Sequence, residues 1–137
     1  MIYITRKETF SAAHRLSRPD WPDEQNREVF GKCSNPNWHG HNYELIVTVK
    51  GEVSEENGFV ANLSEVSAII KEYVLDKVDH RNLNLDVDFM KGKYTSTEVL
   101  AIEIWKQLEK PINTLGCTLH SVKIQETAKN FVEYFGN

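Results

Sequence analysis

The chain has 137 residues, of which 40% are hydrophobic and 26% charged, with a formal net charge of −4 at pH 7. This length suits one compact domain over residues 1–137, and the composition is that of a globular protein. The negative charge argues against a nucleic-acid partner, and no segment reaches the roughly 18 apolar residues of a membrane span, so no membrane partner is expected.

The first predicted element is a strand over residues 3–14, polar enough at residues 6–8 to allow a bulge or an edge position. Residues 15–37 have no convincing periodicity and are expected to form a long loop, which in a compact domain is usually functional or mobile. A second strand over residues 41–49 follows, because apolar residues occupy alternate positions there.

Two helices are predicted next. The first begins at Asn62 and the second at Thr95, and each start is followed three residues later by a glutamate, Glu65 and Glu98, in the position of a capping box. Pro111 is expected to end the second helix.

Two further strands are predicted over residues 118–126 and 130–135. The order is therefore strand, strand, helix, helix, strand, strand. Strand pairs separated by a block of helices favour an α+β domain, here a four-stranded antiparallel sheet with two helices on one face.

Three histidines form a candidate metal site. His39 and His41 are two residues apart, so a strand directs both side chains to the same face, and His14 supplies a third nitrogen if the first two strands pair. Three protein ligands with a fourth position open is typical of catalytic zinc. Two alternatives stay open from spacing alone: a polar patch without metal, and a closed structural site with Cys33 as fourth ligand.

Four motifs occur in order along the chain: Phe10-Ser-Ala-Ala-His-Arg-Leu16, Gly31-Lys-Cys-Ser-Asn-Pro-Asn-Trp-His-Gly-His-Asn-Tyr43, Asp79-His-Arg-Asn-Leu83 and Gln125-Glu-Thr127. Together they closely resemble the 6-pyruvoyl tetrahydropterin synthases, and the match spans nearly the whole sequence. The resemblance implies a tunnelling fold, whose subunits associate into barrel-forming rings, commonly a homohexamer of two stacked trimers with active sites at subunit interfaces.

The resemblance also implies an activity. Enzymes of this family convert 7,8-dihydroneopterin triphosphate to 6-pyruvoyl-5,6,7,8-tetrahydropterin with loss of triphosphate, a step of tetrahydrobiopterin biosynthesis. The implied cofactor is Zn²⁺, acting as a Lewis acid on the side-chain hydroxyls of the pterin substrate, and Mg²⁺ is a candidate companion of the triphosphate. The absence of a visible secretory signal also favours a cytoplasmic location.

Motif by motif, the family's metal ligands fall on His14, His39 and His41. Cys33 takes the place of the catalytic base, which requires a thiolate near neutral pH. Asp79 and His80 match a pair that works with this cysteine in proton transfer, although without the resemblance an Asp-His pair would be read as a solvated loop.

The implied substrate-binding residues lie toward the C-terminus. Glu126 matches the pterin anchor, since a carboxylate can accept two parallel N–H groups from an amino-pyrimidine edge. Thr97 and Glu98 match a pair near the pterin pocket, and a capping box explains Glu98 almost as well. Without the resemblance, Glu126 would be read as a solvent-facing residue at a strand end.

Two rival functions are kept. A 6-carboxytetrahydropterin synthase of queuosine biosynthesis starts from the same substrate, but its cysteine lies closer to the His-Gly-His motif than Cys33, from which residues 34–38 separate it here. A non-catalytic zinc or pterin-binding protein would be expected to lack Cys33, Asp79 or His80, and all are present. One departure from the family is Trp38, where glycine is common.

Overall fold

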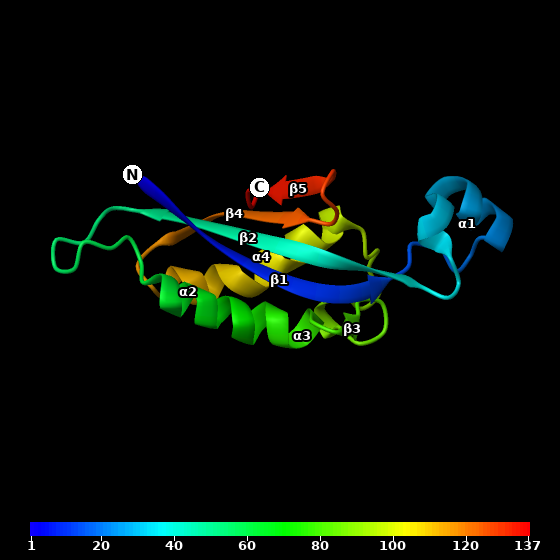
Figure 1. Cartoon of the computed structure of the whole chain (residues 1–137), viewed down its shortest axis with the longest axis horizontal. Coiled ribbons are helices and arrows are strands. Elements are labelled where there is room, and N and C mark those ends of the chain that lie inside the picture. Colours follow the sequence, from blue (N-terminus) through cyan, green and yellow to red (C-terminus); the bar gives the residue numbers. More distant parts are fainter.

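The computed structural model describes residues 1–137 and contains a single mixed sheet (Figure 1). In chain order its elements are β1 (Ile2–His14), α1 (Asp23–Phe30), η1 (Gly31–Ser34), β2 (His39–Gly51), α2 (Leu63–Ile70), η2 (Lys71–Leu75), α3 (Asp76–Val78), β3 (Arg81–Asn82), η3 (Asp88–Met90), α4 (Thr97–Asn113), β4 (Thr118–Gln125) and β5 (Phe131–Tyr134). The strand order across the sheet is β3-β1-β2-β4-β5.

The sheet differs from the prediction in one strand. The four predicted strands are present and pair in antiparallel fashion, but the short β3 adds a fifth strand, parallel to β1. The four-stranded, purely antiparallel sheet was therefore wrong in this detail. β3 was missed because it has only two residues, which is too few to show the alternation of apolar and polar residues by which a strand is recognised.

β1 and β2 form one long antiparallel pair whose register runs without interruption from Ile2 opposite Gly51 to His14 opposite His39. The bulge that the polar residues 6–8 allowed is absent, but the edge position is confirmed, because β3 pairs with β1 only at Ala12 and Ala13 and leaves the rest of that side of β1 unpaired. Because the register is continuous, the ends of the two strands that carry the histidines meet at the same edge of the molecule.

The core lies between the sheet and the helices α2 and α4, which cover one of its faces (Figure 1). Alternate residues of β2, from Tyr43 to Val49, are fully buried against it, and each contributes roughly 1.5–3 kcal/mol of apolar burial. The same core includes Leu100, Ile104, Leu108 and Ile112 of α4. No helix is both long enough and apolar enough to span a bilayer.

The helix starts follow the predicted chemistry with one shift. The side chain of Asn62 accepts a hydrogen bond from the Ser64 amide at 2.9 Å and caps α2. The cap of α4 is Ser96, one residue after the predicted Thr95, so Glu98 is not in capping-box position. Pro111 lies inside the last turn of α4, and its prediction as the end of the helix was wrong.

The predicted loop over residues 15–37 contains the helix α1 and the short turn η1. Asn26 is the only buried residue of α1, so the helix has no apolar stripe and hydrophobic periodicity could not reveal it. Figure 1 shows α1 at the end of the molecule where β1 ends and β2 begins, away from α2 and α4. This insertion lies beside the histidines.

Candidate active site

The three predicted histidines converge at the edge where β1 and β2 end. The ligand atoms of His14, His39 and His41 all lie within 4.8 Å of one another. This follows from the register, which places His14 opposite His39 and Ala12 opposite His41, with all three imidazoles on the helix-covered face. The convergence that the spacing predicted is confirmed.

The free nitrogens of these rings fit a metal ion. His14 Nδ1 lies 2.7 Å from the carbonyl oxygen of Thr95, so the Nδ1–H tautomer donates there and leaves the Nε2 lone pair free. His14 Nε2, both nitrogens of His39 and His41 Nε2 are buried without a hydrogen-bond partner. Buried polar atoms are rarely left unpaired, and a cation at the centre of the cluster would bind one nitrogen of each ring.

The protonation state also suits metal binding. Burial lowers the pKa of His14, His39 and His41, so each imidazole is neutral near pH 7 and offers a lone pair. The structure therefore contains three neutral nitrogen donors that can hold a metal ion.

Glu126 lies immediately beside the histidines, just after the end of β4. Its Oε1 is 3.4 Å from His41 Nε2, without hydrogen-bond geometry, and its Oε2 accepts a short hydrogen bond from the Thr97 hydroxyl. The Glu126 side chain is 21% exposed. A cavity of about 240 Å³ is lined by Thr97, Glu98 and Glu126 together with residues of β5, so the three predicted substrate-binding residues are brought together.

Cys33 is a free, half-buried thiol in η1. Its backbone carbonyl accepts a hydrogen bond from the Leu16 amide at 2.8 Å, which ties η1 to the segment after β1. Burial, with a smaller effect from the Glu126 carboxylate, raises the pKa of the Cys33 thiol, so the metal-free protein favours the neutral form.

Asp79 and His80 form a separate pair at the edge of β1. Their side chains are 3.0 Å apart, and Asp79 Oδ1 accepts a hydrogen bond from the Ser11 amide at 2.9 Å. The Ser11 amide, and then the nearby imidazole, lower the pKa of the Asp79 carboxyl. The His80 side chain is 82% exposed and makes no hydrogen bond or ion pair with Cys33 or the three histidines.

The structure also identifies Tyr43 as a site residue. It ends the second sequence motif, but the motif gave it no role. Tyr43 follows His41 on the same face of β2, and its hydroxyl is buried without a hydrogen-bond partner. Burial, and then the charges of Glu126 and Cys33, raise the pKa of Tyr43, so the phenol stays protonated and can donate. In the sequence, its position two residues after His41 on the same strand already indicated that its side chain lies on the same face as the histidines.

Trp38 has a backbone conformation that glycine adopts more easily. Trp38 has φ of 70°, in the left-handed region that suits glycine. Glycine would be the conformationally easier residue at this turn, and tryptophan adopts this backbone at a cost of about 1–2 kcal/mol.

Comparison with known proteins gives consistent results. The family model for 6-pyruvoyl tetrahydropterin synthase matches residues 3–137. A 6-pyruvoyl tetrahydrobiopterin synthase from Dictyostelium discoideum is 47% identical over 135 residues, covering 98% of this chain and 96% of the relative. A second from Drosophila melanogaster is 43% identical over 140 residues, covering 99% of this chain and 80% of the relative.

A solved structure of Caenorhabditis elegans 6-pyruvoyl tetrahydropterin synthase superimposes with a TM-score of 0.91 at 40% identity, covering 99% of this chain and 96% of that one. A 6-carboxy-5,6,7,8-tetrahydropterin synthase from Bacillus subtilis is 33% identical over 113 residues, covering 79% of this chain and 73% of the relative. Fold, motifs and full-length similarity agree, and the chain belongs to the 6-pyruvoyl tetrahydropterin synthase family.

Proposed function

We propose that this protein is a zinc-dependent lyase that converts 7,8-dihydroneopterin triphosphate to 6-pyruvoyl-5,6,7,8-tetrahydropterin and triphosphate in tetrahydrobiopterin biosynthesis. The observation that carries the proposal is the position of Glu126, 3.4 Å from a histidine of the nitrogen cluster, in a chain that matches synthases of this name over almost its full length. A pterin anchored at Glu126 would extend its side chain toward the histidines.

Zn²⁺ is the metal that the donor set favours, because three neutral imidazoles with an open position are typical of catalytic zinc. His14, His39 and His41 would hold it. When bound, zinc supplies Lewis acidity that makes protons next to the coordinated hydroxyls easier to remove. The hydrogen bond from His14 to the Thr95 carbonyl fixes the orientation of one ligand.

Glu126 is the proposed pterin anchor. Its carboxylate can accept two parallel N–H groups from the amino-pyrimidine edge of a pterin, and the Thr97 hydroxyl holds one of its oxygens in place. Glu98 lines the same cavity and is not used as a helix cap, which supports a role in the pocket.

Cys33 is the proposed base. The reaction moves hydrogens within the substrate and needs no external oxidant, so the protein must remove and return protons at the side-chain carbons. A thiolate is needed, whereas burial raises the pKa of Cys33 in the metal-free chain. A positive charge nearby lowers a thiol pKa, so binding of a dication would move Cys33 toward the active form.

Asp79 and His80 are proposed to act on the site of another subunit. Within one chain they make no hydrogen bond or ion pair with Cys33 or the proposed metal ligands, and His80 is almost fully exposed. A solvent-facing imidazole oriented by a carboxylate is suited to proton transfer once a second copy covers it. Such shared sites agree with the proposed homohexamer of two trimers.

A 6-carboxytetrahydropterin synthase is the second candidate, favoured by the similarity to the Bacillus subtilis enzyme. The lower identity and coverage of that match, and the five residues between Cys33 and His39, favour the pyruvoyl product.

The proposal is tested with Cys33→Ala. Zinc-loaded wild-type protein is expected to release triphosphate from 7,8-dihydroneopterin triphosphate, and the variant should keep its fold and its zinc but release none. Zinc content is measured by elemental analysis and triphosphate by ion chromatography. Loss of zinc in the variant would identify Cys33 as a fourth ligand and the site as a closed structural one.

A further inference from the structure

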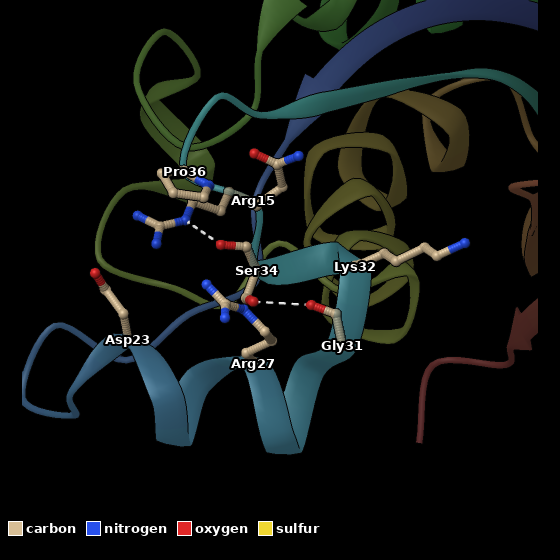
Figure 2. Close-up of a pocket in the computed structure, with 8 residues that line it drawn as sticks. Arg15, Asp23, Arg27, Gly31, Lys32, Ser34 and Pro36 are labelled. Atoms are coloured by element: carbon tan, nitrogen blue, oxygen red, sulfur yellow. Dashed lines mark hydrogen bonds between the residues drawn. The ribbon is translucent and has the colours of Figure 1, made fainter.

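A second cavity lies at the same end of the molecule, between α1, η1 and the residue after β1 (Figure 2). Its volume is about 460 Å³, and its lining consists of charged and polar side chains, a glycine and a proline. Apart from Pro36, no apolar side chain lines it, so it suits a hydrated, charged ligand better than a pterin ring, which needs an apolar surface to pack against.

The charged lining is mostly positive. Arg15, Arg27 and Lys32 contribute cations, and Asp23 contributes the single carboxylate. None of these four side chains takes part in an ion pair within the chain, although the protein as a whole carries a net charge of −4. Unpaired cations around one cavity in an acidic protein favour a multivalent anion.

Arg15 is held so that its outer nitrogens remain available. Its Nε donates to the Ser34 carbonyl at 2.9 Å, and its backbone is fixed by hydrogen bonds with the Asn84 side chain at 3.0 Å in both directions. Figure 2 shows the side chains of Arg15 and Arg27 directed toward the cavity with Asp23, whereas the Lys32 ammonium points away. Two guanidinium groups on one side of a cavity match the geometry of phosphate oxygens.

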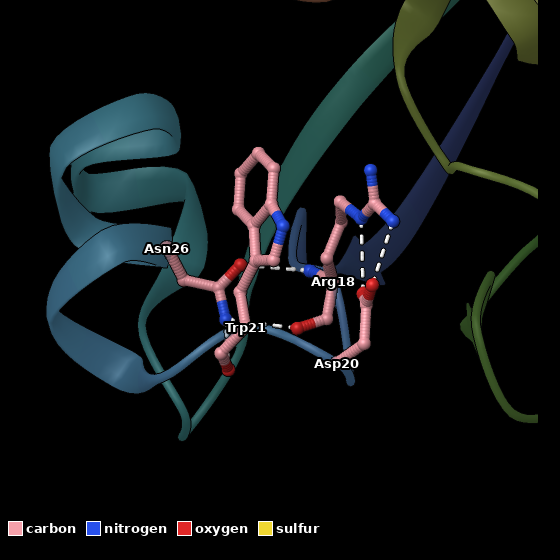
Figure 3. Close-up of polar contacts among 4 residues, drawn as sticks. All are labelled: Arg18, Asp20, Trp21 and Asn26. Carbon is pink, nitrogen blue, oxygen red and sulfur yellow. Dashed lines mark hydrogen bonds and ion pairs between the residues drawn. The ribbon is translucent and has the colours of Figure 1, made fainter.

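The helix that carries Arg27 is held in place before any ligand binds. Asn26 is buried, and its side chain accepts from the Arg18 amide at 2.8 Å and donates to the Arg18 carbonyl at 3.0 Å (Figure 3). The Arg18 guanidinium pairs with Asp20 and lies over the Trp21 ring at 4.8 Å. This network fixes the start of α1 against the preceding segment, so the cavity is preformed.

The cavity also adjoins the candidate active site along the chain. Arg15 directly follows the histidine at the end of β1, and Lys32 and Ser34 flank Cys33. Consecutive Cα atoms are about 3.8 Å apart, so residues that line this cavity are direct chain neighbours of a histidine of the cluster and of the thiol.

We propose that the cavity is a polyphosphate subsite, in which Arg15 and Arg27 bind the triphosphate chain of the substrate that leaves during the reaction. The assignment rests on the proposed function for the identity of the whole substrate. Binding of the polyphosphate itself is independent of turnover.

The test uses inorganic triphosphate as the probe, titrated calorimetrically into zinc-loaded protein. Arg27 is exposed, and its side chain makes no hydrogen bond or ion pair, so Arg27→Gln should fold normally and raise the dissociation constant for triphosphate about tenfold or more. Arg27→Lys should recover part of this loss. The matched control is Lys110→Gln, which removes one positive charge from the last turn of α4, outside the cavity, and should leave the dissociation constant unchanged.

A second arm uses the substrate. Arg27→Gln should raise KM for 7,8-dihydroneopterin triphosphate by a similar factor, while inhibition by 7,8-dihydroneopterin, which lacks phosphates, stays as in the wild type. Triphosphate binding that is equal in Arg27→Gln and Lys110→Gln would overturn the subsite, even if the wild type is active. Triphosphate binding that depends on Arg27 in a protein without turnover would instead retain the subsite and reject the proposed function.

Discussion

Glu126 contacts two different parts of the candidate site, the hydroxyl of Thr97 at the start of α4 and the imidazole of His41 on β2. One carboxylate thereby links the proposed pterin cavity to the proposed metal site. The two proposed functions use different atoms, because the proposed metal ligands are imidazole nitrogens, whereas the proposed pterin anchor is a carboxylate held by the Thr97 hydroxyl.

Glu126→Gln tests this separation. The amide keeps the size of the side chain but can no longer accept two N–H groups with a negative charge, so the dissociation constant for a pterin is expected to rise about ten- to a hundredfold. Zinc content should not change. The control is Glu133→Gln, an exposed glutamate of β5, and unchanged pterin affinity in Glu126→Gln would remove Glu126 from the site.

The histidine cluster predicts a pH dependence for the metal-free protein. Burial lowers the pKa of His14, His39 and His41 below the value of about 6.5 for an unfolded histidine. As the pH falls below about 6.5, the unfolded chain binds protons that the folded chain does not, so the free energy of unfolding decreases. The contribution of the three histidines to the free energy of unfolding is therefore fully present above about pH 6.5 and is lost as the pH falls through their folded-state pKa values.

Urea unfolding of chelator-treated protein, repeated from about pH 7.5 to about pH 5 in steps of about half a pH unit, measures the free energy of unfolding as a function of pH. The decrease should be smaller in His39→Gln, which removes one of the three titrating groups. Stability that is constant or rises as the pH falls below 6.5, with the cluster intact, would contradict the lowered pKa values.

Helix α1 depends on one buried polar side chain instead of an apolar stripe. Asn26 links the helix to the Arg18 and Trp21 backbones, and α1 leads directly into η1, which carries Cys33. An element with so few buried apolar residues is expected to open locally, without unfolding of the sheet.

Asn26→Ala should therefore accelerate amide hydrogen exchange in residues 18–30 about tenfold or more, because the Arg18 amide and carbonyl lose their partner. Exchange in β2 should stay as in the wild type. Hydrogen-exchange mass spectrometry resolves the two segments. A uniform acceleration across the chain would mean that α1 unfolds only together with the core.

Among the helices and strands, the sequence predicted those whose buried residues recur at a regular spacing. The alternation in β2 and the apolar stripe of α4 place their residues correctly, since burial on one face leaves a repeating pattern. Helix α1 and strand β3 leave none, because one buries a single asparagine and the other has two residues. The histidine cluster was predictable from strand parity, whereas the Thr97–Glu126 contact joins separate elements and required the fold.

The proposed proton-transfer pair, Asp79 and His80, lies on the surface of the subunit. Asp79 and His80 are oriented by the Ser11 backbone at the edge of β1, and nothing in the same chain covers the imidazole. We therefore expect each active site to combine Cys33 of one subunit with His80 of another.

Mixing two inactive variants tests this arrangement. Cys33→Ala and His80→Ala should each lack turnover, while subunits of both variants refolded together in equal amounts should recover about a quarter of wild-type activity, since that share of randomly formed shared sites is intact. Each variant refolded alone provides the control. Absence of recovery in mixed assemblies of confirmed composition would place both groups in one chain.

The central claim is the identity of the reaction, and the product tests it most directly. Purified, zinc-loaded protein is incubated with 7,8-dihydroneopterin triphosphate, and the pterin product is identified by mass spectrometry. The proposed function predicts 6-pyruvoyl-5,6,7,8-tetrahydropterin with one equivalent of triphosphate. Formation of 6-carboxytetrahydropterin with release of acetaldehyde would contradict it.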